Sequence, residues 1–232
     1  MAELARTTGI ENLPTLSRMS GALRERAAAV GHISRARLVQ PAVGAGVLDL
    51  PASTDWSHRP SPWSGPITPT GFAPAKSETA IGEGVNLFHD CKSPELSVRQ
   101  VQNRQENDLA PFGLQFDIFD FDGSFLSLVF QTPQPALAGI GKNYVLRLGV
   151  RAECERALGI SARLNLKHGP NTAQVRKEFP PGEDAVEFDL SYIPFNALRV
   201  DQIWFDLFFD APAMNQILIR DVTLSRHLRA AI

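Results

Sequence analysis

From residue 85 onward, hydrophobic and polar residues alternate with the period of β-strands. In residues 112–121, for example, Phe112, Leu114 and Phe116 share one face, because successive side chains of a strand point to opposite sides. Ten such segments are separated by turn-forming sequences: 85–91, 96–101, 112–121, 124–131, 144–150, 160–166, 173–179, 185–190, 202–209 and 216–224. This pattern predicts an all-β fold, an antiparallel jelly-roll-like β-sandwich over residues 82–232.

The N-terminal residues follow a different pattern, with hydrophobic residues at steps of three and four. One narrow stripe consists of Leu16, Met19, Leu23, Ala27 and Val30. This spacing predicts a helix from about Thr15 to Leu38. The stripe is too narrow for a buried helix, so we expect it to dock on one surface, either of this protein or of a partner.

Residues 41–81 are rich in proline and contain Trp56 and Trp63. Proline at this density excludes a helix, and two Trp side chains are costly to leave in water. We therefore expect an extended strap across the domain surface, with a disordered tether as the alternative. The predicted organisation is a helical arm over residues 1–40, a proline-rich strap over 41–81 and a sandwich over 82–232.

The sequence Asp120-Phe121-Asp122-Gly123 has two interpretations, a calcium loop or a hairpin turn. If Gly123 takes position 6 of an EF-hand loop, aliphatic residues occupy positions 1 and 12, where the ion needs ligands. Asp-Gly between two hydrophobic segments is instead a strong signal for a two-residue turn with positive φ. We therefore predict a hairpin that joins residues 112–121 to 124–131, with no bound metal.

The charge of the chain is distributed unevenly. The net charge is −2, which gives no argument for nucleic-acid binding. Residues 1–40 contain six Arg and three Glu, a net charge of +3, so the remaining residues sum to −5. This difference indicates a separate protein partner for the arm, with a solvated helix face as the alternative. The absence of a signal-peptide pattern and of an apolar run of about 18 residues predicts cytoplasmic synthesis and no membrane span.

Known catalytic and metal-binding motifs do not occur in the sequence, and we expect neither enzymatic activity nor a cofactor. The two cysteines, Cys91 and Cys154, are interpreted as packed thiols, and a single disulfide stays open as an alternative. Asp189 and Asp206 lie within apolar strands. They leave polysaccharide hydrolysis as an alternative function, which would require a carboxylate separation of roughly 5 to 10 Å.

Residues 200–226, VDQIWFDLFFDAPAMNQILIRDVTLSR, resemble the end of galactose-binding-like, jelly-roll carbohydrate-binding modules. Asp221, Val222 and Leu224 match the end of the pattern of these modules, whereas Arg220 stands in place of its first acidic residue. The resemblance covers about residues 85–226 and implies the fold more than the ligand. The whole chain is also similar to an uncharacterised family of alphaproteobacterial single-domain proteins. Such modules are frequent behind a docking helix in the spikes or fibres of phage-like particles.

The resemblance implies a non-catalytic glycan-binding module, in which aromatic platforms and flanking polar groups contact sugars. The candidate ligand-binding residues are Tyr192, Asn165, Lys167, His168, Arg176 and Asn215. Two further aromatic candidates are Tyr144 and Trp204, but Trp204 lies between Ile203 and Phe205 and is more typical of a core residue. The alternative functions are a structural adaptor or spike subunit of a phage-like particle, with the N-terminal helix as docking element, and a polysaccharide hydrolase.

Overall fold

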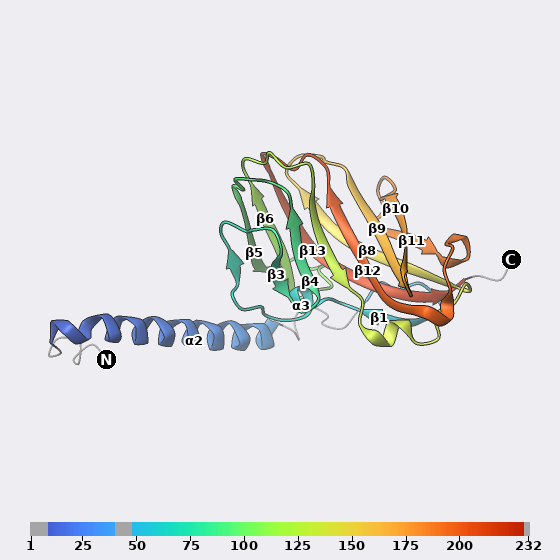
Figure 1. The fold of residues 1–232 in the computed structure, drawn as a ribbon. Coiled ribbons are helices and arrows are strands. Elements are labelled where there is room, and N and C mark those ends of the chain that lie inside the picture. Colours follow the sequence, from blue (N-terminus) through green and yellow to red (C-terminus); the bar gives the residue numbers. More distant parts are fainter. Residues whose placement is uncertain (1–8, 40–47, 230–232) are drawn as a thin grey trace.

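The computed structural model describes residues 9–39 and 48–229, in which two antiparallel sheets pack face to face and a long helix projects from them (Figure 1). All ten segments that were predicted as strands form strands. The predicted all-β, jelly-roll-like sandwich with an N-terminal helix is therefore confirmed.

The strands of the two sheets come from all parts of the sandwich sequence. Sheet A contains, in spatial order, β11 (Ala185–Asp189), β8 (Tyr144–Cys154), β13 (Asn215–Leu228), β6 (Phe112–Ile118), β5 (Leu96–Gln102) and β2 (Gly71–Phe72), with β1 (Thr54–His58) also paired to β13. Sheet B contains β10 (Asn171–Glu178), β9 (Ile160–His168), β12 (Val200–Phe209), β7 (Leu126–Gln131), β4 (Val85–His89) and β3 (Thr79–Gly82). The helical elements are η1 (Ile10–Asn12), α2 (Leu13–Val39), α3 (Ser61–Ser64), η2 (Gln134–Leu137), η3 (Leu190–Tyr192) and η4 (Ala197–Arg199).

The inward-pointing side chains of the two sheets form one hydrophobic core. Aromatic rings cross the space between the sheets: the ring centroids of Phe116 in sheet A and Phe209 in sheet B are 6.1 Å apart. The corresponding distance between Phe188 in sheet A and Phe205 in sheet B is 5.9 Å. Because strand residues alternate between the two sides, the remaining side chains of each sheet form its outward face. These two outward faces are where a binding site can be built.

The described part of the proline-rich segment, residues 48–81, contributes to both sheets of the sandwich. Strand β1 pairs with β13 and β2 with β5 in sheet A, while β3 pairs with β4 in sheet B. The Trp63 side chain of α3 is fully buried in the core, and its indole N–H donates a hydrogen bond of 2.9 Å to the carbonyl oxygen of Ile219. The hydrophobic core of the sandwich therefore includes Trp63, which lies before residue 82, where the predicted sandwich begins.

The predicted hairpin at Asp122-Gly123 is wrong. Strand β6 belongs to sheet A and β7 to sheet B, so residues 119–125 cross from one sheet to the other. Gly123 does not have a positive φ; among the described residues, the glycines with positive φ are Gly84, Gly139, Gly169 and Gly182.

Two carboxylates hold this crossing loop in place. Asp122 accepts hydrogen bonds from the Cys91 thiol at 2.7 Å and from the Lys92 backbone N–H at 3.1 Å. Asp90 in turn accepts hydrogen bonds from the backbone N–H groups of Ser124 and Phe125. The loop is therefore tied to residues 90–92, which are distant in sequence. Cys91 and Cys154 are both free thiols, so the alternative of a disulfide is not realised.

A side chain at position 123 would collide with residues 90 and 91, which hold the crossing loop in place. A Cβ atom added to Gly123 would lie 2.6 Å from Asp90 Oδ1 and 2.9 Å from the backbone nitrogen of Cys91. We expect Gly123→Val to lower the free energy of unfolding by about 1 to 3 kcal/mol, as overpacking does. The control is Gly65→Val, because the Gly65 backbone is extended and a Cβ there meets nothing within 4 Å. Urea unfolding of both variants measures the difference, and equal stabilities would contradict this loop structure.

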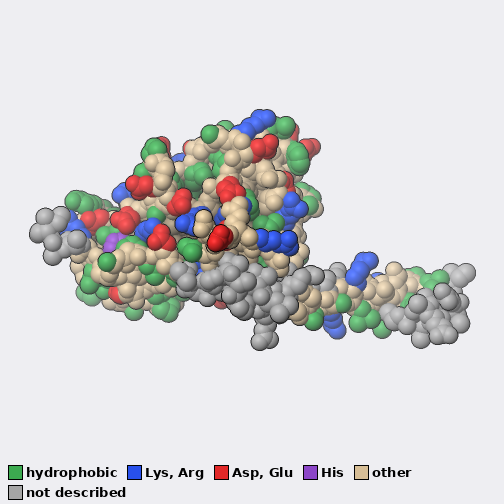
Figure 2. Space-filling model, turned by 180° about the vertical axis from the view of Figure 1, so that it is seen from behind, with side chains coloured by type: hydrophobic (Ala, Val, Ile, Leu, Met, Phe, Trp, Pro, Cys, Tyr) green, Lys and Arg blue, Asp and Glu red, His purple; other side chains and the backbone are tan. Residues whose placement is uncertain are grey.

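Helix α2 (Leu13–Val39) confirms the predicted helix, and three side chains of its apolar stripe, Met19, Leu23 and Val30, are exposed. The exposed fractions are 57% for Met19, 51% for Leu23 and 64% for Val30. Figure 2 shows hydrophobic and basic side chains along the projecting helix. Within the described residues, no helix combines the length and the apolar character needed to cross a membrane.

Candidate functional site

The outward face of sheet B carries a row of aromatic and polar side chains along strands β9 and β12. The inward residues of β12, Ile203 and Phe205, are buried in the core, so the residues next to them point outward. The outward positions of these two strands are Ser161, Arg163, Asn165 and Lys167 on β9 and Gln202, Trp204, Asp206 and Phe208 on β12. We call this surface the sheet B face.

Trp204 lies in the middle of the sheet B face. The strand register places it opposite Asn165 of β9 on one side and opposite Gln131 of β7 on the other. Its side chain is only half-buried, whereas Ile203 and Phe205 are fully buried. The interpretation of Trp204 as a core residue is therefore corrected: its two neighbours fill the core, and the alternation of the strand turns the indole outward.

A buried polar network lies beside Trp204 on strands β9 and β12. The Asn165 amide donates to Asp206 Oδ2 at 2.8 Å and accepts from the Gln174 amide at 2.8 Å. Arg163 donates to the same Asp206 oxygen at 2.7 Å, which neutralises a carboxylate whose side chain is only 4% exposed. The Asn165 side chain is fully buried, and both its amide nitrogen and its amide oxygen are engaged in these hydrogen bonds. Asn165 therefore positions the strands around Trp204.

Cationic side chains cover the second aromatic residue of the face. The guanidinium groups of Arg163 and Arg176 lie 5.0 Å and 4.8 Å from the ring centroid of Phe208. Arg176 also donates to the Ser161 hydroxyl at 2.9 Å. The Arg176 side chain is 53% exposed and keeps donors accessible beside the ring. The Phe208 end of the face thus carries two guanidinium groups, which pair with Asp206 and Asp210, whereas the Trp204 ring is bordered by amides.

Polar side chains border the other end of the face. Lys167 is exposed and lies opposite Gln202 in the register of β9 and β12. The Gln202 amide donates to the Gln131 amide oxygen at 2.7 Å. The structure therefore brings together three of the residues predicted from sequence, Asn165, Lys167 and Arg176, and adds Trp204 as their centre.

The other predicted residues lie outside this group. His168 follows Lys167 at the end of β9, so its side chain points to the opposite side of the strand. Tyr192 lies in η3 beside β8 of sheet A, where it is 79% exposed and its ring is 5.8 Å from the Arg229 guanidinium. Asn215 begins β13, and its buried amide bonds to the backbone of Arg156. The Tyr144 ring packs against Arg226 at 4.5 Å.

The carboxylates of the hydrolase alternative are not brought together. Asp189 ends β11 in sheet A, where it accepts a hydrogen bond from the backbone N–H of Ser191 and pairs with Arg229. Asp206 lies in sheet B and pairs with Arg163. Among residues 9–39 and 48–229, no group of three or more His, Cys, Asp or Glu side chains is arranged to hold a metal ion.

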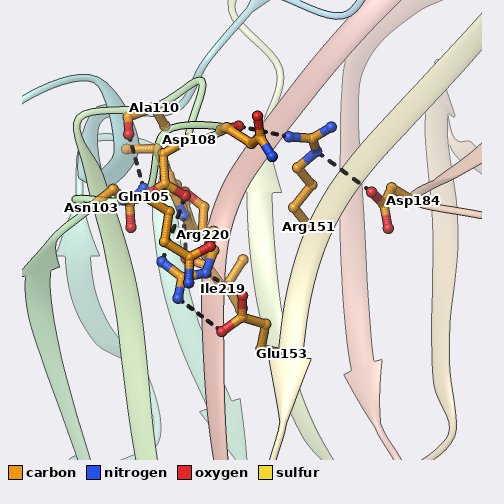
Figure 3. Close-up of polar contacts among 11 residues, drawn as sticks. Asn103, Gln105, Asp108, Ala110, Arg151, Glu153, Asp184, Ile219 and Arg220 are labelled. Carbon is orange, nitrogen blue, oxygen red and sulfur yellow. Dashed lines mark hydrogen bonds and ion pairs between the residues drawn. The ribbon is translucent and has the colours of Figure 1, made fainter. Parts of the chain in front are cut away.

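A hollow on sheet A is lined mostly by charged and polar residues (Figure 3). Arg220 of β13 pairs with Glu153 of β8 and, at 3.5 Å, with Asp108 of the loop between β5 and β6. Arg151 pairs with Asp184 at 3.5 Å (Figure 3). It also donates to the carbonyl oxygen of Asn107 at 3.1 Å. These pairs tie two loops to the strands. These charged side chains pair with one another and stabilise the loops. The sheet B face is therefore the better candidate for a ligand-binding site.

Comparisons with known proteins place the whole chain in one family model and find distant structural likenesses. The model is described as "Family of unknown function (DUF6478)" and matches residues 1–232. A comparison with curated proteins found no match.

Three similar solved structures show how low the sequence identity and the structural similarity are. The enzymatically active domain of bacteriophage CBA120 tailspike protein 4 has 5% identity and a TM-score of 0.42; the match covers 68% of this chain and 21% of that one, about a fifth of its length. The family 11 carbohydrate-binding module of the cellulase Lic26A-Cel5E of Clostridium thermocellum has 9% identity, coverage of 70% and 98%, and a TM-score of 0.39. The CBM22-1 xylan-binding domain of Paenibacillus barcinonensis Xyn10C has 11% identity, coverage of 79% and 100%, and a TM-score of 0.38. These likenesses assign no ligand to this chain.

Proposed function

The chain belongs to the family of unknown function DUF6478, and we propose that this member is a non-catalytic glycan-binding module whose ligand lies on the sheet B face. The observation that carries the proposal is the outward Trp204 in the middle of that face, bordered by Gln131 and Gln202 and held by a buried polar network. A large aromatic side chain is costly to leave in water unless it has a partner.

The chemistry of the face suits a sugar. The C–H groups of a pyranose ring stack on an indole, and its hydroxyl groups exchange paired hydrogen bonds with amides and with cationic donors. Gln202 and Lys167 supply such groups on one side of Trp204, and Arg176 supplies them near Phe208. The strands fix the backbone at these positions before a ligand arrives, which lowers the entropic cost of binding.

We expect Trp204→Ala to weaken glycan binding at least about tenfold, which corresponds to about 1.4 kcal/mol. The test is a screen of the full-length protein against neutral and uronic-acid-containing oligosaccharides at up to millimolar concentration, followed by titration of the best binder. Tyr192→Ala is the matched control, because Tyr192 is an exposed aromatic residue beside sheet A. The proposal fails if no oligosaccharide binds, or if the two variants lose affinity equally.

A second candidate function is structural, with helix α2 as a docking element for a particle or envelope assembly. The observation that favours it is the exposure of Met19, Leu23 and Val30 along a helix that also carries exposed arginines. A helix that presents apolar side chains to water is a common recognition element for a groove on another protein. This role is independent of glycan binding, because it uses a different part of the chain.

A further inference from the structure

Four loops meet at one end of the sandwich, and we call this surface the loop end: residues 90–95, 119–125, 155–159 and 210–214. Hydrogen bonds join neighbouring loops. The N–H of Met214 donates to Phe119 at 3.0 Å, and the N–H of Asp210 donates to Gly159 at 2.9 Å. The backbone N–H of Phe125 donates to the Asp90 carboxylate at 3.2 Å. The loop end is therefore one continuous surface.

The loop end exposes large apolar side chains. The exposed fractions are 60% for Phe119, 57% for Met214 and 38% for Phe125. The backbone of Met214 has a φ of 52°, a conformation that is unfavourable for a residue with a side chain. An adjoining hollow is lined by the apolar residues Leu158, Ile160 and Phe179, with Gly159, Glu178 and Asp210 beside them. Apolar groups gathered in this way are typical of a protein-binding surface.

The loop end is also acidic. The four loops contain six carboxylates and two basic residues, a net charge of −4: Asp90, Glu95, Asp120, Asp122, Glu155 and Asp210 against Lys92 and Arg156. The hydrogen bond from the Ser124 hydroxyl lowers the pKa of Asp90, and the hydrogen bond from the Cys91 thiol lowers the pKa of Asp122. Both groups therefore stay charged at neutral pH, and the loops that expose the apolar side chains also carry a net negative charge.

Helix α2 has the complementary character. Its 27 residues span about 40 Å at the usual rise of an α-helix. Met19 and Leu23 are exposed, and so are the neighbouring Arg18, Arg24 and Arg26. Exposed apolar side chains with neighbouring arginines match exposed apolar side chains on acidic loops, both in side-chain type and in sign.

The two complementary surfaces belong to opposite ends of the sandwich. Strand β13 begins beside the loop end, where Met214 precedes it, and has 14 residues, a length of about 46 Å. Its far end pairs with β1, with Thr54 opposite His227, so the chain that leads from helix α2 enters the sandwich there. A molecule that carries complementary surfaces at opposite ends associates head to tail with its own copies.

We propose that the loop end is the docking surface for helix α2 of a second copy of this chain. The inference rests on the docking role of helix α2 given above and not on glycan binding. In the complex, Met19 and Leu23 of one copy contact Phe119 and Met214 of the next, and the arginines of the helix face the carboxylates of the loop end. Each copy uses its helix once and its loop end once, so association continues from copy to copy.

The test uses three full-length variants in sedimentation-velocity and light-scattering measurements. The arm variant is Met19→Asp/Leu23→Asp, and the end variant is Phe119→Ser/Met214→Ser. The control is Leu198→Ser, because Leu198 is 97% exposed but belongs to neither surface. We expect the wild type and the control to associate with increasing concentration, and less so at high salt, whereas each double variant alone is monomeric.

A mixture of the two double variants gives the decisive result. The arm variant retains an intact loop end and the end variant retains an intact helix, so we expect a complex of one copy of each that grows no further. Restored association also shows that both variants are folded. The inference is overturned if the wild type is monomeric at every concentration, as it would be if the helix docked on its own copy. It is also overturned if the mixture of the two double variants stays monomeric. If only the arm variant loses association, helix α2 docks elsewhere: the docking role stands and the loop end is wrong.

Discussion

Trp63→Ala is expected to lower the free energy of unfolding by about 3 to 5 kcal/mol, the cost of deleting a large buried aromatic side chain. The Trp63 side chain is 0% exposed, and its ring centroid lies 5.9 Å from that of Phe130 in sheet B. The deletion leaves a cavity between the sheets. It also removes the hydrogen bond to the carbonyl oxygen of Ile219, which is buried.

The control for this prediction is Trp56→Ala, which removes the same atoms from a half-buried position on β1. We expect a clearly smaller loss, because the site opens to water and leaves less of a cavity. Urea unfolding followed by circular dichroism measures both changes. If Trp63→Ala costs less than about 1 kcal/mol, a threshold well below the usual range for such deletions, the proline-rich segment does not complete the core as described.

Arg59→Met is expected to lower the free energy of unfolding by about 3 to 5 kcal/mol, because it leaves a buried carboxylate without its guanidinium partner. Arg59 donates two hydrogen bonds of 2.8 Å to Asp221, one to each carboxylate oxygen. The side chains are only 8% and 6% exposed. The pair also joins the proline-rich segment to β13, so its loss weakens the connection between them.

The loss should depend on pH. Burial raises the pKa of Asp221, and Arg59 opposes this rise, so removing Arg59 raises the pKa further. A carboxyl group whose pKa is raised by folding destabilises the folded state once it must ionise. This destabilisation begins near the unfolded pKa, about 3.9, and is complete above the folded pKa. The penalty of Arg59→Met should therefore be full at pH 8 and shrink as the pH falls through this window.

The double variant Arg59→Met/Asp221→Asn is the matched control for this pair. It removes the buried charge and should recover part of the stability that Arg59→Met loses, with little dependence on pH. Unfolding in urea at several pH values distinguishes the variants. A pH-independent loss in Arg59→Met would contradict the presence of a buried, unpaired carboxylate.

The strands could be predicted because their signal is local. In β6 and β9, the alternation of apolar and polar residues is visible within a few residues. The crossing loop could not be predicted in this way. Asp122-Gly123 has the local pattern of a hairpin, but contacts with Asp90 and Cys91, more than 30 residues away, decide its course.

The centre of the candidate site was missed because Trp204 and both of its neighbours are apolar, so hydrophobicity alone does not show which side faces the core. Gln202 and Asp206, two residues before and after it, share its side of the strand. These polar residues were the available signal that Trp204 points outward. The network from Asn165 to Asp206 could not be predicted, because it depends on the pairing of β9 with β12.

The most direct test of the proposed glycan site is the NMR signal of the Trp indole N–H groups during titration with the best-binding oligosaccharide. The chain has three Trp residues, Trp56, Trp63 and Trp204, which single Trp-to-Phe variants assign. The proposal predicts that the Trp204 signal shifts and saturates with the binding curve, while the signal of buried Trp63 stays in place. A ligand that binds without moving the Trp204 signal would contradict a glycan site on the sheet B face.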